Sequence, residues 1–205
     1  MGPGLLEPWQ DSAKQLGSCP VRRKVVVFGE VVGMDAGARG GAGSVARFAA
    51  FYDVYFDEVF RYLCRGMLGD RARAEDLTQD TFAAAAAAAR AGREEAMTVT
   101  WVMGIARHKL IDCYRRSDRE QRALARVAAL PVRGGDGELV EGISQVIEAM
   151  RSLRREHQLV LVLRYLDEQS ISAIAAHIDR SEHATESLLA RARRALSGCM
   201  SEARP

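Results

Sequence analysis

The stretch WVMGIARHKLIDCYRRSDR, residues 101–119, predicts a single helix with two chemically different faces. At 3.6 residues per turn its apolar side chains fall on one arc, as in a helix packed against a core. This arc holds Val102, Met103, Ala106, Leu110, Cys113 and Tyr114. The opposite arc holds His108, Asp112, Arg115, Arg116 and Arg119, and Trp101 and Ile105 share it. Guanidiniums beside an exposed ring are suited to hold a phosphate backbone while a base stacks. The alternative is a solvated basic face with Trp101 folded back into the core.

The residues before this stretch predict two further helices. Apolar side chains recur at three and four residues from Phe48 to Met67, and this aromatic stripe is typical of a core face. Gly69 and Asp70 then predict a break and an N-terminal cap. The next helix begins near Arg71 and includes an alanine run, which has the highest helix propensity. On it Asp76, Gln79 and Asp80 share one face, which is either solvated or suited to a basic partner helix.

After residue 117 the periodicity fades, and PVRGGDGE (131–138) predicts a linker between two helical units. The helical pattern returns at Leu139, and LVLVLRYL (159–166) is apolar nearly all round, as in a buried helix. We therefore expect an all-α protein with two small helical domains, the first over 45–120 and the second over 139–198. Residues 121–138 are the expected linker, and 199–205 form a tail.

The second unit contains the pattern of a helix-turn-helix. Ser170 is placed to cap a short helix that ends near Ile178, a turn follows over 179–181, and a longer helix spans 182–196. The outward residues of the turn and second helix include Ser181, His183, Glu186, Ser187, Arg193 and Arg194, with Arg191 at the margin. Helical hairpins of this shape bind DNA or serve as plain packing units, and the pattern alone leaves both open.

Composition narrows the remaining possibilities. The formal net charge is only +2, so nucleic-acid binding depends on how the charge is distributed. The four cysteines are widely spaced and form no CxxC pair, so we expect reduced thiols and no bound metal. The Gly- and Pro-containing residues 1–44 are expected to be disordered, and Met34 is a hypothetical translation start. The short valine run near residue 25 is interrupted by Glu30, so we expect no signal peptide and no membrane span.

Three blocks, EDLTQDTF (75–82), WVMGIARHKLIDCYRR (101–116) and LVLVLRYLDEQSISAIAAHIDRSEHATESLLARARRAL (159–196), together resemble the extracytoplasmic-function sigma factors of bacterial RNA polymerase. Their order, spacing and intervening linker match that family. The resemblance covers residues 48–196. It implies a cytoplasmic, non-enzymatic protein without a cofactor, which binds core RNA polymerase and promoter DNA and is controlled by an anti-sigma factor.

The resemblance also implies a role for each block. The first implies a surface that binds core polymerase, formed by Asp76, Gln79, Asp80 and Phe82. The second implies a surface that binds and helps to melt the minus-ten promoter element, formed by Trp101, His108, Asp112, Arg115, Arg116 and Arg119. The helix-turn-helix implies a surface for the minus-thirty-five element, formed by Ser181, His183, Glu186, Ser187, Arg191, Arg193 and Arg194.

The chain departs from the family pattern within the helix-turn-helix. The family commonly has Gly at the turn where Asp179 stands. It commonly has Val-Lys-Ser-Arg where residues 185–188 read TESL, so an acid and a leucine replace two basic residues. We therefore expect the phosphate contacts to shift to Arg191, Arg193 and Arg194.

Two other functions are consistent with parts of the pattern. A sigma-like module could sequester an anti-sigma protein without starting transcription, although it would not need the basic and aromatic face around Trp101. An enzyme could use His108 and Asp112, one helical turn apart, as metal ligands. No third ligand at a suitable spacing and no glycine-rich phosphate loop accompany them.

Overall fold

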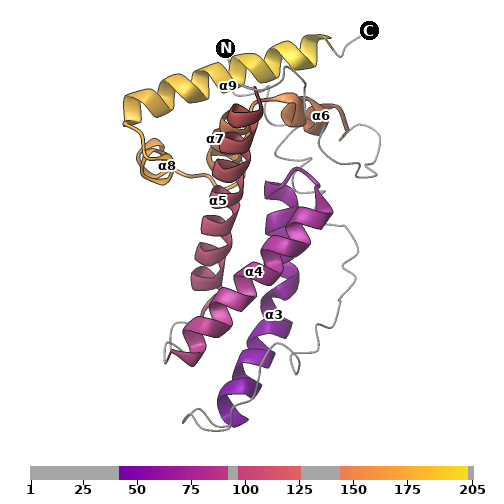
Figure 1. Cartoon of the computed structure of the whole chain (residues 1–205), viewed down its shortest axis with the longest axis vertical. Helices are drawn as coiled ribbons and strands as arrows, with labels where there is room; N and C mark the ends of the chain where they lie inside the picture. Colours follow the sequence, from indigo (N-terminus) through magenta and orange to yellow (C-terminus); the bar gives the residue numbers. More distant parts are fainter. Residues whose placement is uncertain (1–41, 92–96, 126–143, 203–205) are drawn as a thin grey trace.

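The computed structural model describes residues 42–91, 97–125 and 144–202, which form seven helices and no strand (Figure 1). This confirms the all-α prediction. The first domain consists of α3 (Ala42–Gly66), α4 (Arg71–Arg90) and α5 (Val99–Ala125). The second consists of α6 (Ser144–Ser152), α7 (Arg155–Tyr165), α8 (Ile171–Ile178) and α9 (Glu182–Glu202). Within these described ranges, no helix is both long and apolar enough to cross a lipid bilayer.

The first domain is held together by the aromatic face of α3. Phe48, Phe51, Val59, Leu63 and Met67 are buried, as their spacing predicts. Where α3 ends it lies so close to α5 that a Cβ on Gly66 would stand 2.7 Å from Cδ2 of the buried Leu110. The hydroxyl of Tyr114 donates to the carbonyl of Gly66 over 2.8 Å. The absence of a side chain at residue 66 therefore allows α5 to pack directly on α3.

The turn between α3 and α4 forms where Gly69 and Asp70 predicted it. Gly69 has a φ of 81°, a conformation that glycine adopts without strain. The Asp70 side chain accepts a hydrogen bond from the backbone amide of Arg73 (3.1 Å), which satisfies an otherwise free donor in the first turn of α4. The predicted cap is confirmed.

The second domain packs around α7, whose residues 158–163 are all buried. One of them, Gln158, is polar and has no exposed surface. Its amide nitrogen donates to the carbonyls of Arg151 and Leu153, both over 2.9 Å, and its amide oxygen accepts from Arg155. Because every polar atom of its side chain is paired, Gln158 can be buried, and it joins the end of α6 to the start of α7.

Three helix boundaries differ from the sequence prediction. Helix α3 begins at Ala42, before the expected domain start at residue 45, and α5 continues to Ala125, five residues into the expected linker. Helix α9 continues to Glu202, past its expected end at residue 196 and into the expected tail. Helix formation is cooperative once nucleated, so these helices extend beyond their strongly apolar residues. The rest of the N-terminal extension, the PVRGGDGE segment, Leu139 and the end of the tail lie outside the described residues.

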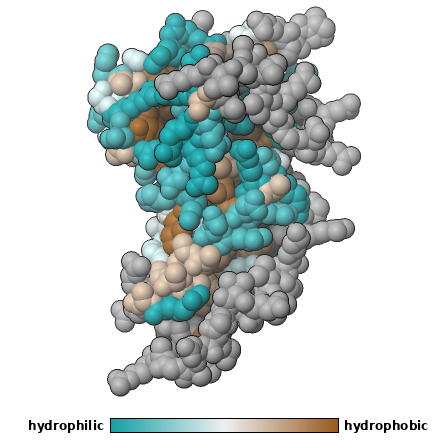
Figure 2. Space-filling view, viewed as in Figure 1, coloured by the Kyte–Doolittle hydropathy of each residue, from teal (hydrophilic) through white to brown (hydrophobic). Residues whose placement is uncertain are grey.

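The two domains contact each other along α5. The C-terminal part of this long helix lies beside α7, with α8 on the neighbouring side (Figure 1). One continuous cluster of buried apolar residues includes members of both domains. Hydrophilic side chains cover most of the described surface on the face shown in Figure 2, and hydrophobic ones appear in separate patches. We call this contact of the second domain with α5 the closed arrangement.

Candidate polymerase and nucleic-acid interfaces

The outer face of α4 carries the side chains proposed for protein docking. Asp76, Gln79 and Asp80 are all exposed. The opposite face is buried, and it includes Thr78 and Thr81, whose hydroxyls donate to carbonyls one turn earlier over 2.7 Å. Helix α4 is therefore fixed on one side and presents two carboxylates and an amide on the other.

Phe82 requires a correction. Its side chain is 2% exposed and packs against the rings of Tyr52 and Phe56 on α3, with centroid distances of 4.7 and 6.1 Å. It follows Asp80 by only two residues, but this step along a helix turns it toward the core. Phe82 therefore positions α4 and does not itself contact a partner.

Helix α5 begins at a polar cap, and the residues of its predicted DNA-binding face are exposed to different extents. The hydroxyl of Thr98 accepts from the amide of Trp101 (3.2 Å), so Thr98 caps the helix. His108, Asp112, Arg116 and Arg119 are exposed, whereas Arg115 is half-buried. Trp101 is also half-buried and packs against the core cluster, so its ring lies at the margin of this face. The apolar arc is mostly buried as predicted, and Ile111, which was not predicted to belong to it, is buried as well.

Part of the α5 outer face is occupied by the second domain. The Arg115 guanidinium donates to the backbone carbonyl of His177 on α8. The rings of His108 and His177 meet edge to face with centroids 5.9 Å apart. Two residues proposed for promoter binding thus lie against the helix-turn-helix of the same chain.

A buried carboxylate lies beside this contact. Asp167, in the loop after α7, accepts from Nε of Arg107 and from the hydroxyl of Tyr62, both over 2.9 Å. Burial, and next the negative charge of Asp167, raise the pKa of Tyr62 well above its usual value, so its hydroxyl keeps its proton and donates. These three residues come from three distant segments, so no local sequence pattern predicts that they meet.

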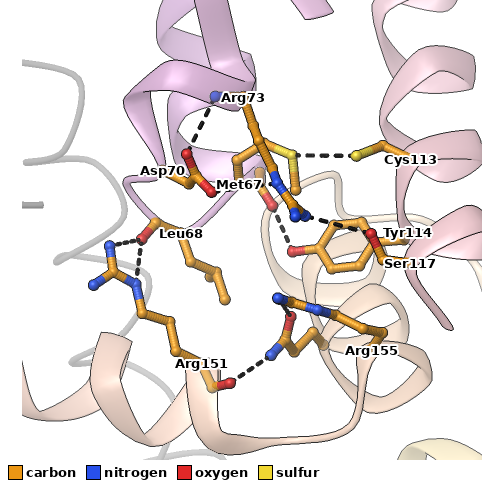
Figure 3. Close-up of polar contacts among 11 residues, drawn as sticks. Met67, Leu68, Asp70, Arg73, Cys113, Tyr114, Ser117, Arg151 and Arg155 are labelled. Atoms are coloured by element: carbon orange, nitrogen blue, oxygen red, sulfur yellow. Dashed lines mark hydrogen bonds and ion pairs between the residues drawn. The ribbon is translucent and has the colours of Figure 1, made fainter. Parts of the chain in front are cut away.

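A crevice continues along the same boundary. It has a volume of about 340 Å³ and is lined on the α5 side by Asp112, Arg115, Asp118, Arg119 and Arg122. Across it, Glu156 of α7 accepts from Arg122 and from Arg180, each over 3.0 Å. Figure 3 shows a further contact between the domains, in which Arg151 of α6 donates twice to the carbonyl of Leu68, over 3.1 and 2.9 Å.

The helix-turn-helix has the predicted form. The Ser170 hydroxyl accepts from the amide of Ala173 (3.1 Å) and caps α8, and the turn places Asp179 at a φ of 54°. This left-handed conformation explains why glycine is favoured at this position of the turn, and Asp tolerates it better than most residues. The predicted DNA-facing residues of the turn and α9 are all exposed: Ser181, His183, Glu186, Ser187, Arg191, Arg193 and Arg194.

The inner face of α9 includes two residues that were not predicted to lie there. Thr185 is fully buried, and its hydroxyl donates to the carbonyl of Ser181 (3.0 Å). Leu189 is also buried, and so is its neighbour Leu188. Because Leu188 faces the core, the leucine at this position packs α9 against the domain and makes no contact with DNA.

Metal binding was a possible role for His108 and Asp112. Across the described ranges, no set of three or more His, Cys, Asp or Glu side chains is placed to hold a metal ion. Cys113 and Cys199 are free thiols.

The two domains match two known sequence families in order. Residues 51–120 match the family model of sigma-70 region 2, and residues 143–196 match that of sigma-70 region 4. The chain belongs to the extracytoplasmic-function sigma factors. The first domain is thus region 2 of this sigma-family chain, and the helix-turn-helix belongs to region 4.

Individual relatives agree with this family. The ECF RNA polymerase sigma factor BldN of Streptomyces coelicolor is 29% identical over 174 residues, which are 80% of this chain and 64% of that protein. The RNA polymerase sigma factor YlaC of Bacillus subtilis is 29% identical over 160 residues, which are 75% of this chain and 91% of that protein. The match thus spans less than two thirds of the Streptomyces protein. A solved RsbN–BldN complex contains a chain that is 27% identical, with 76% of this chain and 93% of that chain covered and a TM-score of 0.29.

Proposed function

We propose that this sigma-family chain binds core RNA polymerase in the cytoplasm and directs it to promoters. The observation that carries the proposal is the match to regions 2 and 4 in order, with exposed polar surfaces where the family binds its partners. The chain performs no catalysis in this role, because the polymerase forms the phosphodiester bonds.

In this proposal the outer face of α4 docks on the clamp helices of the largest polymerase subunit. The supporting geometry is the exposure of Asp76, Gln79 and Asp80 on a helix whose other side is fixed in the core. Carboxylates on a rigid helix favour a partner surface rich in Lys and Arg.

Promoter DNA is bound by two separate surfaces. Arg115, Arg116 and Arg119 on α5 hold phosphates of the minus-ten element, and Trp101 at the margin of this face stacks on an unpaired base. The α9 surface enters the major groove of the minus-thirty-five element, where Arg191, Arg193 and Arg194 contact phosphates. Reading of base edges falls to the other exposed residues, Ser181, His183, Glu186 and Ser187.

The test is run-off transcription with purified core polymerase on candidate promoters from the same genome. We expect a promoter-dependent transcript only when the chain is added. The alternative function, sequestration of an anti-sigma protein, predicts no transcript. The absence of both a transcript and core binding would overturn the proposal.

A charge reversal tests the docking face separately. Asp80→Arg should weaken core binding by about tenfold or more, because it places a cation against a basic surface. The matched control is Glu58→Arg, which reverses an exposed acid on α3. Equal core affinity for both variants would remove the α4 face from the proposal.

The family resemblance also supports an anti-sigma partner, which we propose as the regulator of this chain. Affinity capture with the full chain from its native cell extract, followed by reconstitution of the purified partner with the chain, tests it. The captured protein should block the run-off transcript in proportion to its concentration.

A further inference from the structure

Helix α9 has an acidic beginning and a basic continuation. The stretch SEHATESLLA (181–190), which covers the end of the turn and the first turns of the helix, contains no Lys or Arg and carries two carboxylates, Glu182 and Glu186. The cations follow in RARR (191–194). In a helix-turn-helix the first residues of the second helix contact the base edges. The part of α9 that meets the bases is therefore negatively charged, although DNA is itself an anion.

One of the two acids has an explanation within the helix. Glu182 lies in the first turn of α9, where a negative charge is favourable beside the free amides of the helix N-terminus. This effect fades beyond the first turn, and Glu186 is the fifth residue of the helix. The helix dipole therefore accounts for Glu182 and not for Glu186.

Ion pairing along the helix does not account for Glu186 either. Residues three and four positions apart are neighbours on a helix surface, and at those distances from Glu186 stand Glu182, His183, Leu189 and Ala190. None of them is Lys or Arg, and two glutamates four residues apart slightly destabilise a helix. Among the residues that the structure describes, no ion pair includes Glu186. Its carboxylate thus has no role in holding α9 together.

Glu186 occupies the middle of the outward face of these first turns. Thr185 and Leu188 on either side of it are buried. Glu186 itself is exposed, and so are His183 and Ser187 beside it. A duplex whose major groove receives α9 therefore meets the Glu186 carboxylate directly.

The major groove offers few partners to a carboxylate, which accepts hydrogen bonds and donates none. Guanine presents the acceptors N7 and O6 there, and thymine presents the acceptor O4, so all three oppose an anion. The donors are the amino groups at N4 of cytosine and N6 of adenine. Adenine also carries the acceptor N7 beside its amino group. Cytosine is therefore the base that a carboxylate selects.

We propose that Glu186 is a specificity-determining residue that accepts a hydrogen bond from N4 of a cytosine in the minus-thirty-five element. This inference rests on the proposed promoter-binding function, and it names the base that one position of α9 reads. Arg193 lies seven residues beyond Glu186 on the same face, about 10 Å along the helix at about 1.5 Å per residue. The arginine holds the phosphate backbone without regard to sequence, while the acid selects the base.

Selection of promoters by the reconstituted holoenzyme tests the proposal. Core polymerase with wild type, Glu186→Gln or Glu186→Lys is mixed with duplexes whose minus-thirty-five element is randomised, and the bound duplexes are sequenced. Wild type should enrich cytosine at one position. At that same position Glu186→Gln should enrich adenine, because Gln pairs with N6 and N7 of adenine, and Glu186→Lys should enrich guanine.

The matched control is Glu148→Gln on α6. It neutralises an acid whose side chain is 75% exposed and which belongs to neither proposed DNA surface, so it should enrich the same sequence as wild type. Urea denaturation followed by circular dichroism establishes that each variant is folded. Both Glu186 variants should be at least as stable as wild type, because each removes the repulsion between Glu182 and Glu186.

Fluorescence anisotropy of the same holoenzymes on duplexes that differ at the selected base pair measures the size of the effect. Replacement of the cytosine by guanine should weaken wild-type binding about tenfold. Glu186→Gln should bind every duplex more tightly, because it removes a negative charge near phosphates, but its preference for cytosine over guanine should be lost. The ratio of the two affinities therefore separates base reading from general repulsion.

Each outcome decides between this inference and the proposed function. If wild type and both Glu186 variants enrich the same sequence, Glu186 reads no base, and the inference alone is wrong. If the Glu186 variants change the overall affinity but keep the wild-type ratio between cytosine and guanine, the carboxylate acts only by repulsion, and the inference is again wrong. If wild type enriches no sequence beyond core polymerase alone, the proposed function fails, and the inference fails with it.

Discussion

Helices α5 and α9 each carry an outward row of arginines, yet the fold treats the two rows differently. On α9, Arg191 and Arg194 donate to carbonyls one turn earlier in the same helix and remain exposed. On α5, Arg115 donates to the second domain and is half-buried. Helix α5 crosses from one domain to the other, whereas α9 lies at the outside of the second domain (Figure 1). The two rows of arginines are therefore similar in sequence but differ in exposure, because α5 contacts the second domain and α9 lies at its outside.

This difference separates two kinds of DNA contact. The α9 row can reach a duplex in the free chain, so its contribution should be measurable without polymerase. On α5, Arg115 is available only after the domains separate, whereas Arg116 and Arg119 are exposed, so the contribution of Arg115 should be measurable only in the holoenzyme.

The largest expected effect follows loss of the α5 guanidiniums. Arg115→Ala combined with Arg116→Ala should lower open-complex formation by the holoenzyme about tenfold or more, since each charge-assisted contact contributes about 1.5–3 kcal/mol. Loss of two phosphate contacts should also reduce the salt slope by about 1.4 on a single strand. Permanganate footprinting at several salt concentrations measures both quantities.

The control for this double variant is Arg90→Ala, at the exposed end of α4. It removes one positive charge from a residue that belongs to neither proposed DNA surface, and it should leave the salt slope unchanged. If the double variant has the wild-type salt slope, Arg115 and Arg116 do not contact phosphate. The proposed difference between the DNA contacts of α5 and α9 is then wrong.

Removal of the buried side-chain amide of Gln158, at the junction of α6 and α7, should affect the arginine rows of both α5 and α9. Gln158→Leu leaves the carbonyls of Arg151 and Leu153 without their donor, at a cost of about 1–3 kcal/mol in the free energy of unfolding. Because the junction supports the whole second domain, α9 should lose duplex binding while α5 becomes more accessible.

Urea denaturation followed by circular dichroism measures this loss of stability. Hydrogen exchange of α5 amides reports the accompanying change in accessibility. Unchanged exchange in α5 despite a destabilised second domain would show that the second domain does not cover this helix.

A smaller effect is expected from the α9 row. Arg193→Ala combined with Arg194→Ala should weaken duplex binding by the free chain and reduce its salt slope by about 1.8, or about 0.9 for each phosphate contact. The radius of gyration should stay at the wild-type value, because neither side chain faces the other domain.

Fluorescence anisotropy with a duplex that carries the upstream promoter element checks this prediction, and Arg61→Ala on α3 is the control. A wild-type salt slope in the double variant would place the phosphate contacts elsewhere on α9. A larger radius would show that the α9 row also holds the closed arrangement.

The smallest expected effect is a pH dependence of the contact between the second domain and α5. Partial burial, followed by the charges of His108 and Arg107, lowers the pKa of His177, while Asp167 opposes this and Arg115 adds to it. The separated or unfolded chain therefore binds a proton at His177 more readily than the closed chain does. Closure should weaken as the pH falls through about 6.5, the usual pKa of histidine.

Small-angle scattering and urea denaturation at pH 7.5 and pH 6.0, values on either side of about 6.5, measure this dependence. His177→Gln should reduce it. The control is His183→Gln, on the exposed face of α9, which should leave it unchanged. Equal pH dependence in wild type and His177→Gln would assign the effect to another group, such as His157, whose pKa is lowered mainly by partial burial.

Much of the local structure could be predicted because its signals are local. The helical periodicity of α3 and α5, the caps at Asp70 and Ser170, and the turn at Asp179 all depend on residues within a few positions of each other. The α4 face was identified for the same reason. Phe82 was misassigned because membership in a motif does not show which face of the helix a residue occupies.

The sequence by itself determined the helices, their caps, the two-domain order and the family, since periodicity, capping and motif spacing are properties of neighbouring residues. Only the tertiary structure decided which of the polar helix faces is contacted by the other domain. Tyr62 and Asp167 lie 105 residues apart, and Arg107 and Asp167 lie 60 apart. No periodic pattern links residues so distant, because such contacts form only after the packed helices bring them together. The contact that half-buries Arg115 against α8 is therefore a property of the fold and not of the α5 sequence.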